Sequence, residues 1–385
     1  MFSLYDSGEL PANKLRFVRN IVGKALLLFL AINLLFILTN PLPVLGRLSA
    51  YNHLFPGRKR LPYGENPQRS YNLSLNNLEA MFASHELDGK TKAEDEYRVI
   101  IIGDSSTWGF LLQPNQTFTS VLTNAGISLS DGRRIKAYNL GYPVMSLAKD
   151  LLILSLAMRY QPDLVIWPLT LESFPYDKQL FAPLLQNNPS LVQQLAQTYH
   201  LNLTPQKPSQ TGELLWKRTL IAARRDLADL IRLQLYGALW AATGIDQDIP
   251  EEFTPRMQDL PAGLDFHNLQ PPDLQEEDLA FEVLDAGVKM AGKTPILFIN
   301  EPMFISQGQN SDIRYNYYYP RWAYDDYRIM LAEKCLANGW NCIDLWDAVP
   351  AVEFTNTAVH MTPEGNRLFA QQIIRTILDS ILSEN

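Results

Sequence analysis

A short run of β-branched residues that ends abruptly at a glycine is the feature that most constrains the fold. Val99 to Ile102 is too short for a helix, and the turn Gly103-Asp104-Ser105 follows at once, which is typical of a buried strand in a parallel sheet. The loops after such strands form the crevice in which an open α/β sheet binds ligands. Ser105 is therefore a candidate nucleophile. The alternative is that Asp104, Ser105 or Ser106 only caps the following helix.

Four more apolar runs of strand length follow, and segments with helical periodicity separate them. The strands are expected at Ile135 to Leu140, Leu164 to Leu169, Ile296 to Asn300 and Cys342 to Leu345. Strands that alternate with helices predict an α/β fold with a three-layer, doubly wound parallel sheet. The alternation stops from about residue 175 to 272, where helical stretches occur without a convincing strand. We expect a helical insertion there.

The N-terminal region contains an apolar segment long enough to cross a membrane. Ile21 to Leu38 is apolar apart from Lys24 and Asn33, and a bilayer-spanning helix needs about 20 apolar residues. A cleaved signal peptide is the alternative. The segment is followed by Asn40-Pro41-Leu42-Pro43 rather than by a pair of small residues, which favours an uncleaved signal anchor.

Basic residues near the apolar segment indicate its orientation. Lys14, Arg16 and Arg19 precede it, and Lys and Arg are enriched on the cytoplasmic side of membrane-spanning helices. Arg47 and the run Arg58 to Arg60 follow it, which weakens this signal. We expect a single-pass membrane protein with a cytoplasmic N-terminus (1–20), a transmembrane signal anchor (21–39), a connector (40–96) and an extracytoplasmic α/β domain (97–385).

Composition and short motifs exclude some partners. The 385-residue chain carries a formal net charge of -8, which argues against nucleic acid, because that binding depends on Lys and Arg contacts to phosphate. The sequence has no glycine pattern of a nucleotide-binding loop and no cluster with metal-ligand spacing, so we expect neither a cofactor nor a metal. Cys335 and Cys342 are expected either as a local disulfide or as two buried thiols.

One of the five histidines lies where a base could reach the crevice. His360 stands just before Thr362-Pro363-Glu364, and these residue types suit the N-cap and first turn of a C-terminal helix. The histidine is therefore expected on a loop after the last strand, from which its imidazole can project into the crevice. The alternative is an ordinary surface histidine.

Three short blocks in this order resemble those of the SGNH or GDSL hydrolases. The Gly-Asp-Ser block matches residues 103–105, a glycine after the second strand matches Gly141, and the histidine before the last helix matches His360. The resemblance implies the SGNH fold, which is flavodoxin-like, over residues 98–381. It also implies that Ser105 attacks an ester carbonyl with His360 as its base, and that the N–H groups of Ser105 and Gly141 bind the oxyanion.

Two positions depart from the family pattern. Leu171 stands where the family has an asparagine that donates to the oxyanion, and Thr170 or a group on the following loop could replace it. Thr357 stands where the family has the aspartate of the triad. The neighbouring Asn356 could orient the imidazole, as asparagine does in cysteine-protease triads. Otherwise a backbone carbonyl would orient it, which leaves a Ser–His dyad.

Together with the membrane anchor, the resemblance implies a membrane-tethered, extracytoplasmic serine esterase or O-acyltransferase. Its substrate would be an acyl ester of a cell-envelope glycan, by analogy with alginate O-acetyltransferases, or a small ester. The alternative is a catalytically degenerate SGNH-fold protein that binds an envelope glycan or scaffolds a membrane acyltransferase partner. The fold alone does not decide between these functions.

Overall fold

A parallel sheet is the centre of the fold. The computed structural model describes residues 12–55, 57–63, 77–203, 216, 218–247 and 249–383. Its strands run in the order β2-β1-β3-β4-β5, and all neighbouring pairs are parallel. Their bounds are β1 Glu96–Ile101, β2 Arg134–Asn139, β3 Leu164–Leu169, β4 Ile296–Asn300 and β5 Asn341–Asp344. The predicted doubly wound sheet is confirmed.

Helices cover both faces of the sheet. Side chains along β1, and Ile102 directly after it, therefore alternate between two cores. Ile100 and Ile102 belong to the core on the side of α7, α13 and α14, whereas Val99 and Ile101 belong to the core on the side of α6 and α15. All four side chains are fully buried. These helices are α6 Phe118–Asn124, α7 Leu147–Ala157, α13 Phe281–Ala291, α14 Arg321–Asn338 and α15 Pro363–Ser383. The apolar run that marked the first strand is therefore buried on both faces, as parallel sheets require.

The strand order changes direction beside β1. The chain passes from β1 to β2 on one side and then returns to place β3 on the other side of β1. In such open sheets the crevice for ligands forms at the carboxyl ends of the strands where the order switches. Ser105 begins α5 (Ser105–Trp108) directly after β1, so it lies at this switch point.

A helical insertion separates β3 from β4, as expected. Its elements are η3 Leu171–Ser173, α8 Tyr176–Gln179, α9 Pro183–Gln186, α10 Pro189–Tyr199, α12 Arg224–Thr243 and η4 Glu276–Asp278. Part of the predicted insertion, residues 204–215, 217 and 248, lies outside the described residues. The helix α12 packs against α2, α3 and α4, so the insertion contacts the region that precedes the sheet.

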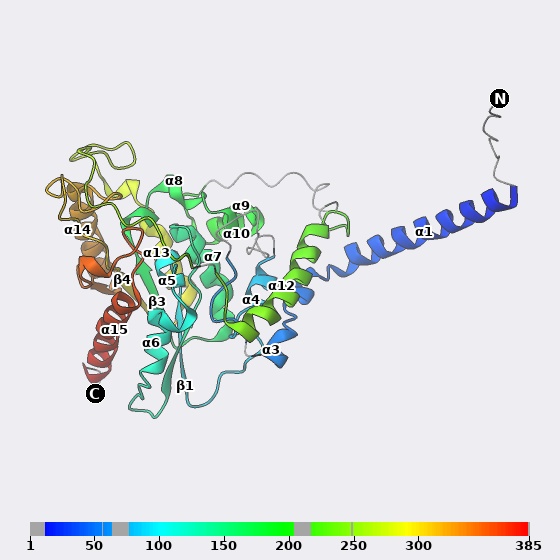
Figure 1. The fold of residues 1–385 in the computed structure, drawn as a ribbon, viewed down its shortest axis with the longest axis horizontal. Helices are drawn as coiled ribbons and strands as arrows, with labels where there is room; N and C mark the ends of the chain where they lie inside the picture. Colours follow the sequence, from blue (N-terminus) through cyan, green and yellow to red (C-terminus); the bar gives the residue numbers. More distant parts are fainter. Residues whose placement is uncertain are drawn as a thin grey trace.

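The N-terminal helix α1 (Ala12–Thr39) extends away from the α/β domain (Figure 1). Within it, Arg16–Thr39 has a mean hydropathy of 2.5 in its most apolar window, and this one helix of the described chain is long and apolar enough to cross a membrane. Asn33 is buried, and its Oδ1 accepts a hydrogen bond of 3.1 Å from the N–H of Leu220 in the insertion. The last turns of α1 therefore contact the domain.

The segment between α1 and the sheet packs on the domain. It contains α2 Leu42–Gly46, α3 Tyr51–Leu54 and α4 Leu78–Ala83. Met81 and Phe82 of α4 are fully buried in the same core as Ile100. The expected connector is thus partly structural: its described residues cover one face of the α/β domain.

Cys335 and Cys342 form a disulfide, which decides between the two alternatives left open by the sequence. Cys335 lies near the end of α14 and Cys342 lies in β5, with their Cα atoms 6.1 Å apart. Gly339, at a φ of 64°, ends α14 between them. A left-handed residue turns the chain back sharply, which brings the two cysteines together.

Candidate active site

The turn that carries Ser105 is built by its neighbours. Asp104 caps α5, since its Oδ1 accepts a hydrogen bond of 2.8 Å from the N–H of Ser106. Gly103 has a φ of 152°, and a Cβ atom there would lie 2.3 Å from the hydroxyl oxygen of Thr107. A side chain at this position is therefore excluded. The capping role predicted as an alternative falls to Asp104, which leaves the half-buried Ser105 hydroxyl available for another contact.

The hydroxyl of Ser105 lies against His360. Its Oγ is 2.8 Å from His360 Nε2, although 255 residues separate the two in the sequence. The histidine lies on the loop between η5 (Ala351–Glu353) and α15. Backbone contacts fix this loop: the N–H of Thr355 donates to the carbonyl of His360 at 2.8 Å. The structure thus brings together the two residues that the sequence selected.

The far side of the imidazole contacts Asn356. Nδ1 of His360 lies 2.8 Å from Asn356 Oδ1. An amide oxygen only accepts hydrogen bonds, so Nδ1 carries the proton and Nε2 presents its lone pair to the Ser105 hydroxyl. Thr357 does not take this position, because its hydroxyl oxygen accepts hydrogen bonds from the N–H groups of Val359 and His360. Asn356 is therefore the residue that orients the ring, and Thr357 holds the loop.

His360 is kept neutral by burial. It is 7% exposed, and this burial lowers its pKa from 6.5 to about 3. The ring of Phe110 stacks on it, with centroids 4.6 Å apart and an angle of 25° between the planes. An uncharged imidazole with a free lone pair can accept a proton at neutral pH. Phe110 was not selected from the sequence, where only its closeness to Ser105 could have indicated it.

The expected role of Gly141 as an oxyanion donor stays a prediction. Its N–H donates a hydrogen bond of 2.9 Å to Asn139 Oδ1, so an oxyanion would compete with Asn139 for this donor. A Cβ atom on Gly141 would lie 2.5 Å from the backbone nitrogen of Trp108. The glycine is therefore required for close contact between the end of β2 and α5. Asn139 strengthens that contact, since its Nδ2 donates to the carbonyl of Thr107 at 2.7 Å.

The position at which the family pattern has an asparagine, Leu171, lies in the segment directly after β3. Leu171 is fully buried, and its side chain offers no donor. The buried Thr170 hydroxyl oxygen lies 2.6 Å from the hydroxyl oxygen of Tyr319, which also accepts a hydrogen bond of 3.2 Å from the N–H of Glu172. Thr170 therefore links this loop to the segment before α14. Its expected service as an oxyanion donor stays a prediction.

Several buried titratable side chains lie close to the turn that carries Ser105. Lys149 Nζ donates to the carbonyl oxygens of Gly103 and Tyr142, each at 2.7 Å, and pairs with Asp150. Burial raises the pKa of Glu301 well above its usual range, and the nearby carboxylate of Asp104 raises it further. Burial therefore favours the protonated form of this carboxyl group. The lysine thus links the turn before Ser105 to the segment that follows β2.

A second histidine lies at the same edge of the sheet. His267 Nε2 is 3.1 Å from Glu172 Oε2, and its Nδ1 is 3.0 Å from Asp177 Oδ2. The hydrogen bond to Glu172 raises the pKa of His267, and Asp177 adds to the effect. This histidine is favoured as a cation, which makes it a poor base. No sequence pattern predicts this contact, because 95 residues separate His267 from Glu172.

Comparisons with known proteins find similar folds. No protein-family model and no curated protein matches the sequence. The chain is similar to a lipolytic protein of the G-D-S-L family from Veillonella parvula, with 9% identity and a TM-score of 0.34 over 72% of this chain and 96% of that one. A carbohydrate acetylesterase from Sinorhizobium meliloti has 12% identity and a TM-score of 0.32 over 74% of this chain and 99% of that one.

A third similar structure is the periplasmic domain of a lipopolysaccharide acetyltransferase from Salmonella ser. Paratyphi A. It has 11% identity and a TM-score of 0.30, and the match covers 75% of this chain and 86% of that one. Similarity at this level assigns no chemistry, which has to come from the side chains of the site. Fold and side chains together define a doubly wound α/β protein in which Ser105, His360 and Asn356 contact one another in sequence at the switch point. We call these three residues the relay.

Proposed function

We propose that this chain is a membrane-tethered serine esterase or O-acyltransferase, with Ser105 as nucleophile and His360 as general base. The observation that carries the proposal is the 2.8 Å contact between Ser105 Oγ and a buried, neutral His360 Nε2. A serine hydroxyl is a weak nucleophile alone, and an adjacent base that removes its proton activates it. Packing gives no reason for a histidine with a lone pair directed at a half-buried hydroxyl.

The reaction would proceed in two steps. Ser105 Oγ forms a bond to the ester carbonyl carbon while His360 takes the hydroxyl proton, and the imidazolium then returns it to the leaving alcohol oxygen as the ester bond breaks. Water hydrolyses the acyl-enzyme in an esterase, and an acceptor hydroxyl takes the acyl group in a transferase. Asn356 keeps the proton on Nδ1. We propose the N–H groups of Ser105 and Gly141 as oxyanion donors, with Thr170 as a further candidate.

The proposed substrate is an acyl ester of a cell-envelope glycan. The basic residues before the apolar segment of α1 favour a cytoplasmic N-terminus, and an anchor of this length would then hold the α/β domain at the outer surface of that membrane. A tethered enzyme acts on substrates within reach of that surface, where glycans are abundant. A membrane-impermeant fluorophosphonate probe that fails to label the chain in intact cells would contradict the proposed orientation.

The test of the nucleophile is covalent labelling of the full-length protein. A fluorophosphonate probe should attach to Ser105, as located by mass spectrometry of the labelled peptide, and Ser105→Ala should abolish the labelling. Ser106→Ala is the matched control, because the neighbouring Ser106 is 4% exposed and should leave labelling within a few-fold of wild type. Undiminished labelling of Ser105→Ala would exclude the assignment.

A second candidate function is binding without catalysis. The side chain of Leu171 offers no oxyanion donor, and the N–H of Gly141 donates a hydrogen bond to Asn139. Loss of one such donor costs about 10²–10³ in rate, so a protein with this site could bind an envelope glycan or scaffold a membrane acyltransferase instead. That function requires that Ser105→Ala and His360→Ala leave the cellular phenotype intact, whereas the enzyme requires that each abolishes it.

A further inference from the structure

The loop that follows Ser105 is held by residues from two distant parts of the chain. The helix α5 is a single turn, and Gly109, at a φ of 88°, ends it. A helix of this length is not stable alone, and the carbonyl groups at its end need partners. Arg60 provides them: its Nη1 donates to the carbonyl oxygens of Trp108 at 3.3 Å, Gly109 at 2.7 Å and Leu112 at 3.0 Å.

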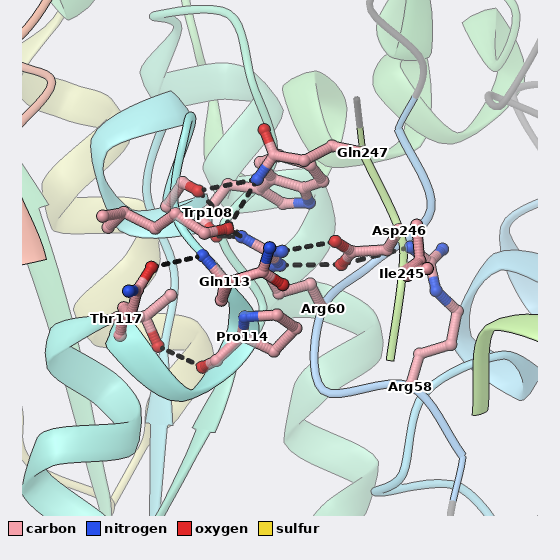
Figure 2. Close-up of polar contacts among 12 residues, drawn as sticks. Arg58, Arg60, Trp108, Gln113, Pro114, Thr117, Ile245, Asp246 and Gln247 are labelled. Carbon is pink, nitrogen blue, oxygen red and sulfur yellow. Dashed lines mark hydrogen bonds and ion pairs between the residues drawn. The ribbon is translucent and has the colours of Figure 1, made fainter. Parts of the chain in front are cut away.

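Asp246 from the insertion fixes the guanidinium of Arg60. Its Oδ2 accepts from Nε at 2.7 Å, its Oδ1 accepts from Nη2, and Arg58 Nη2 lies 3.5 Å from the same carboxylate. Figure 2 shows the carboxylate between the two arginines. The Arg60 and Asp246 side chains are only 1% and 7% exposed. A two-bonded carboxylate fixes both the position and the rotation of a guanidinium, so Asp246 determines where Arg60 points.

The next residue of the insertion holds the same loop. Gln247 Nε2 donates to the carbonyl oxygens of Gly109 at 3.2 Å and Leu112 at 2.7 Å, and its Oε1 accepts from the N–H of Leu111 at 3.0 Å (Figure 2). Between these residues lies Phe110, the ring that stacks on His360. The contacts of Arg60, Asp246 and Gln247 therefore fix both sides of the relay: the helix of Ser105 and the ring that covers His360.

We propose that Arg60, Asp246 and Gln247 are positioning residues for Ser105 and His360. Through them the connector and the insertion act on the nucleophile, although none of the three touches the relay. This inference rests on the proposed function of Ser105. A misplacement of about 1 Å in a reacting group can cost about 10²-fold in rate, so loss of the Arg60–Asp246 contact should slow the reaction of Ser105 with a probe far more than it weakens probe binding.

The matched control is a second buried ion pair at the other end of β1. Arg98 Nε lies 2.5 Å from Glu96 Oε1, and these side chains are 2% and 8% exposed, which is close to the exposure of Arg60 and Asp246. This pair lies at the amino end of the strand, away from Ser105. Asp246→Asn and Glu96→Gln each remove one buried charge and keep a similar shape. Since Asp246 also faces Arg58, the melting temperature of each variant is needed to separate its cost to the fold from its effect on labelling.

The experiment measures fluorophosphonate labelling of the full-length protein at several probe concentrations, together with the melting temperature. Asp246→Asn should lower the maximal labelling rate by about 10- to 100-fold, whereas Glu96→Gln should lower the melting temperature with labelling within about 2-fold of wild type. Gln247→Ala removes no charge, should fold even if Asp246→Asn does not, and should slow labelling by more than about 3-fold.

Three outcomes would overturn the inference. Equal slowing by Asp246→Asn and Glu96→Gln would reduce the Arg60–Asp246 contact to general stabilisation. Wild-type labelling rates in both Asp246→Asn and Gln247→Ala would do the same. A wild-type protein that no probe labels at Ser105 would instead contradict the proposed function, and the inference would fall with it.

Discussion

Two histidines lie at the carboxyl edge of one sheet, and their surroundings shift their pKa values in opposite directions. His360 is buried against Phe110, with an amide and a hydroxyl as its polar neighbours, and its pKa is lowered to about 3. His267 lies between two carboxylates, and its pKa is raised. A neutral imidazole can take a proton and a charged one cannot. The comparison explains why only one of them suits the role of base.

Replacement of the two histidines should have very unequal effects on the site. His360→Gln removes the proposed base and should slow fluorophosphonate labelling of Ser105 by about 10²–10⁴-fold, the usual contribution of a positioned general base. His267→Gln should leave labelling within about 3-fold, since this residue is bonded to Glu172 and Asp177 instead. Similar losses in both variants would show that the different surroundings of the two histidines do not decide which one acts on Ser105.

The orienting amide should matter next. Asn356→Ala removes the acceptor for Nδ1–H, so the ring can rotate or change its tautomer. The expected loss in maximal labelling rate is about 10²-fold, which is typical of a displaced catalytic group. Thr357→Ala is the matched control, because its hydroxyl holds only backbone N–H groups. A greater loss in Thr357→Ala would reverse the assignment of the two residues.

Asn356→Asp should make the surroundings of His360 more like those of His267. A carboxylate beside the imidazole favours its charged form and raises its pKa, by about 1–3 units for a close pair. The acid limb of the pH–rate profile should therefore move upward by at least about one pH unit, because the base must be neutral to act. An unchanged acid limb would mean that His360 does not titrate in the measured reaction.

The parts of this site that the sequence predicted share one property: each depends on local pattern. The run Val99 to Ile102 fixes a buried strand, and Ser105 must then lie at its carboxyl end. His360 and Asn356 are four residues apart, so one loop can bring them together. The competing partner of the Gly141 N–H was not predicted: Asn139, two residues earlier, folds back and accepts this hydrogen bond. Such a local competitor is invisible in a motif.

The parts that the sequence did not predict depend on contacts across the fold. Arg60 and Asp246 are 186 residues apart, and no periodicity or motif relates a connector to an insertion. The Glu172–His267 contact is of the same kind. Each pair becomes predictable only when the layers are known, because burial of an arginine or a lysine requires a nearby carboxylate or several carbonyl groups.

The smallest expected effect is on the pH dependence of stability, and its sign is opposite for the two histidines. The pKa of His267 is raised in the folded state, so its contribution is fully present below the unfolded value near about 6.5 and is lost as pH rises through the folded pKa. The pKa of His360 is lowered, so unfolding takes up a proton there between about pH 6.5 and the folded value of about 3, and stability falls as pH drops through that range.

Chemical denaturation at pH 5 and pH 8 should therefore separate the two variants. His267→Gln should cost more stability at pH 5 than at pH 8, by no more than about 1 kcal/mol, since the exposed Asp177 and solvent screening reduce the pair. His360→Gln should reduce the loss of stability between pH 8 and pH 5, because the group that takes up a proton on unfolding is gone. A pH dependence that changes in the same direction in both variants would contradict the opposite pKa shifts on which the choice of base depends.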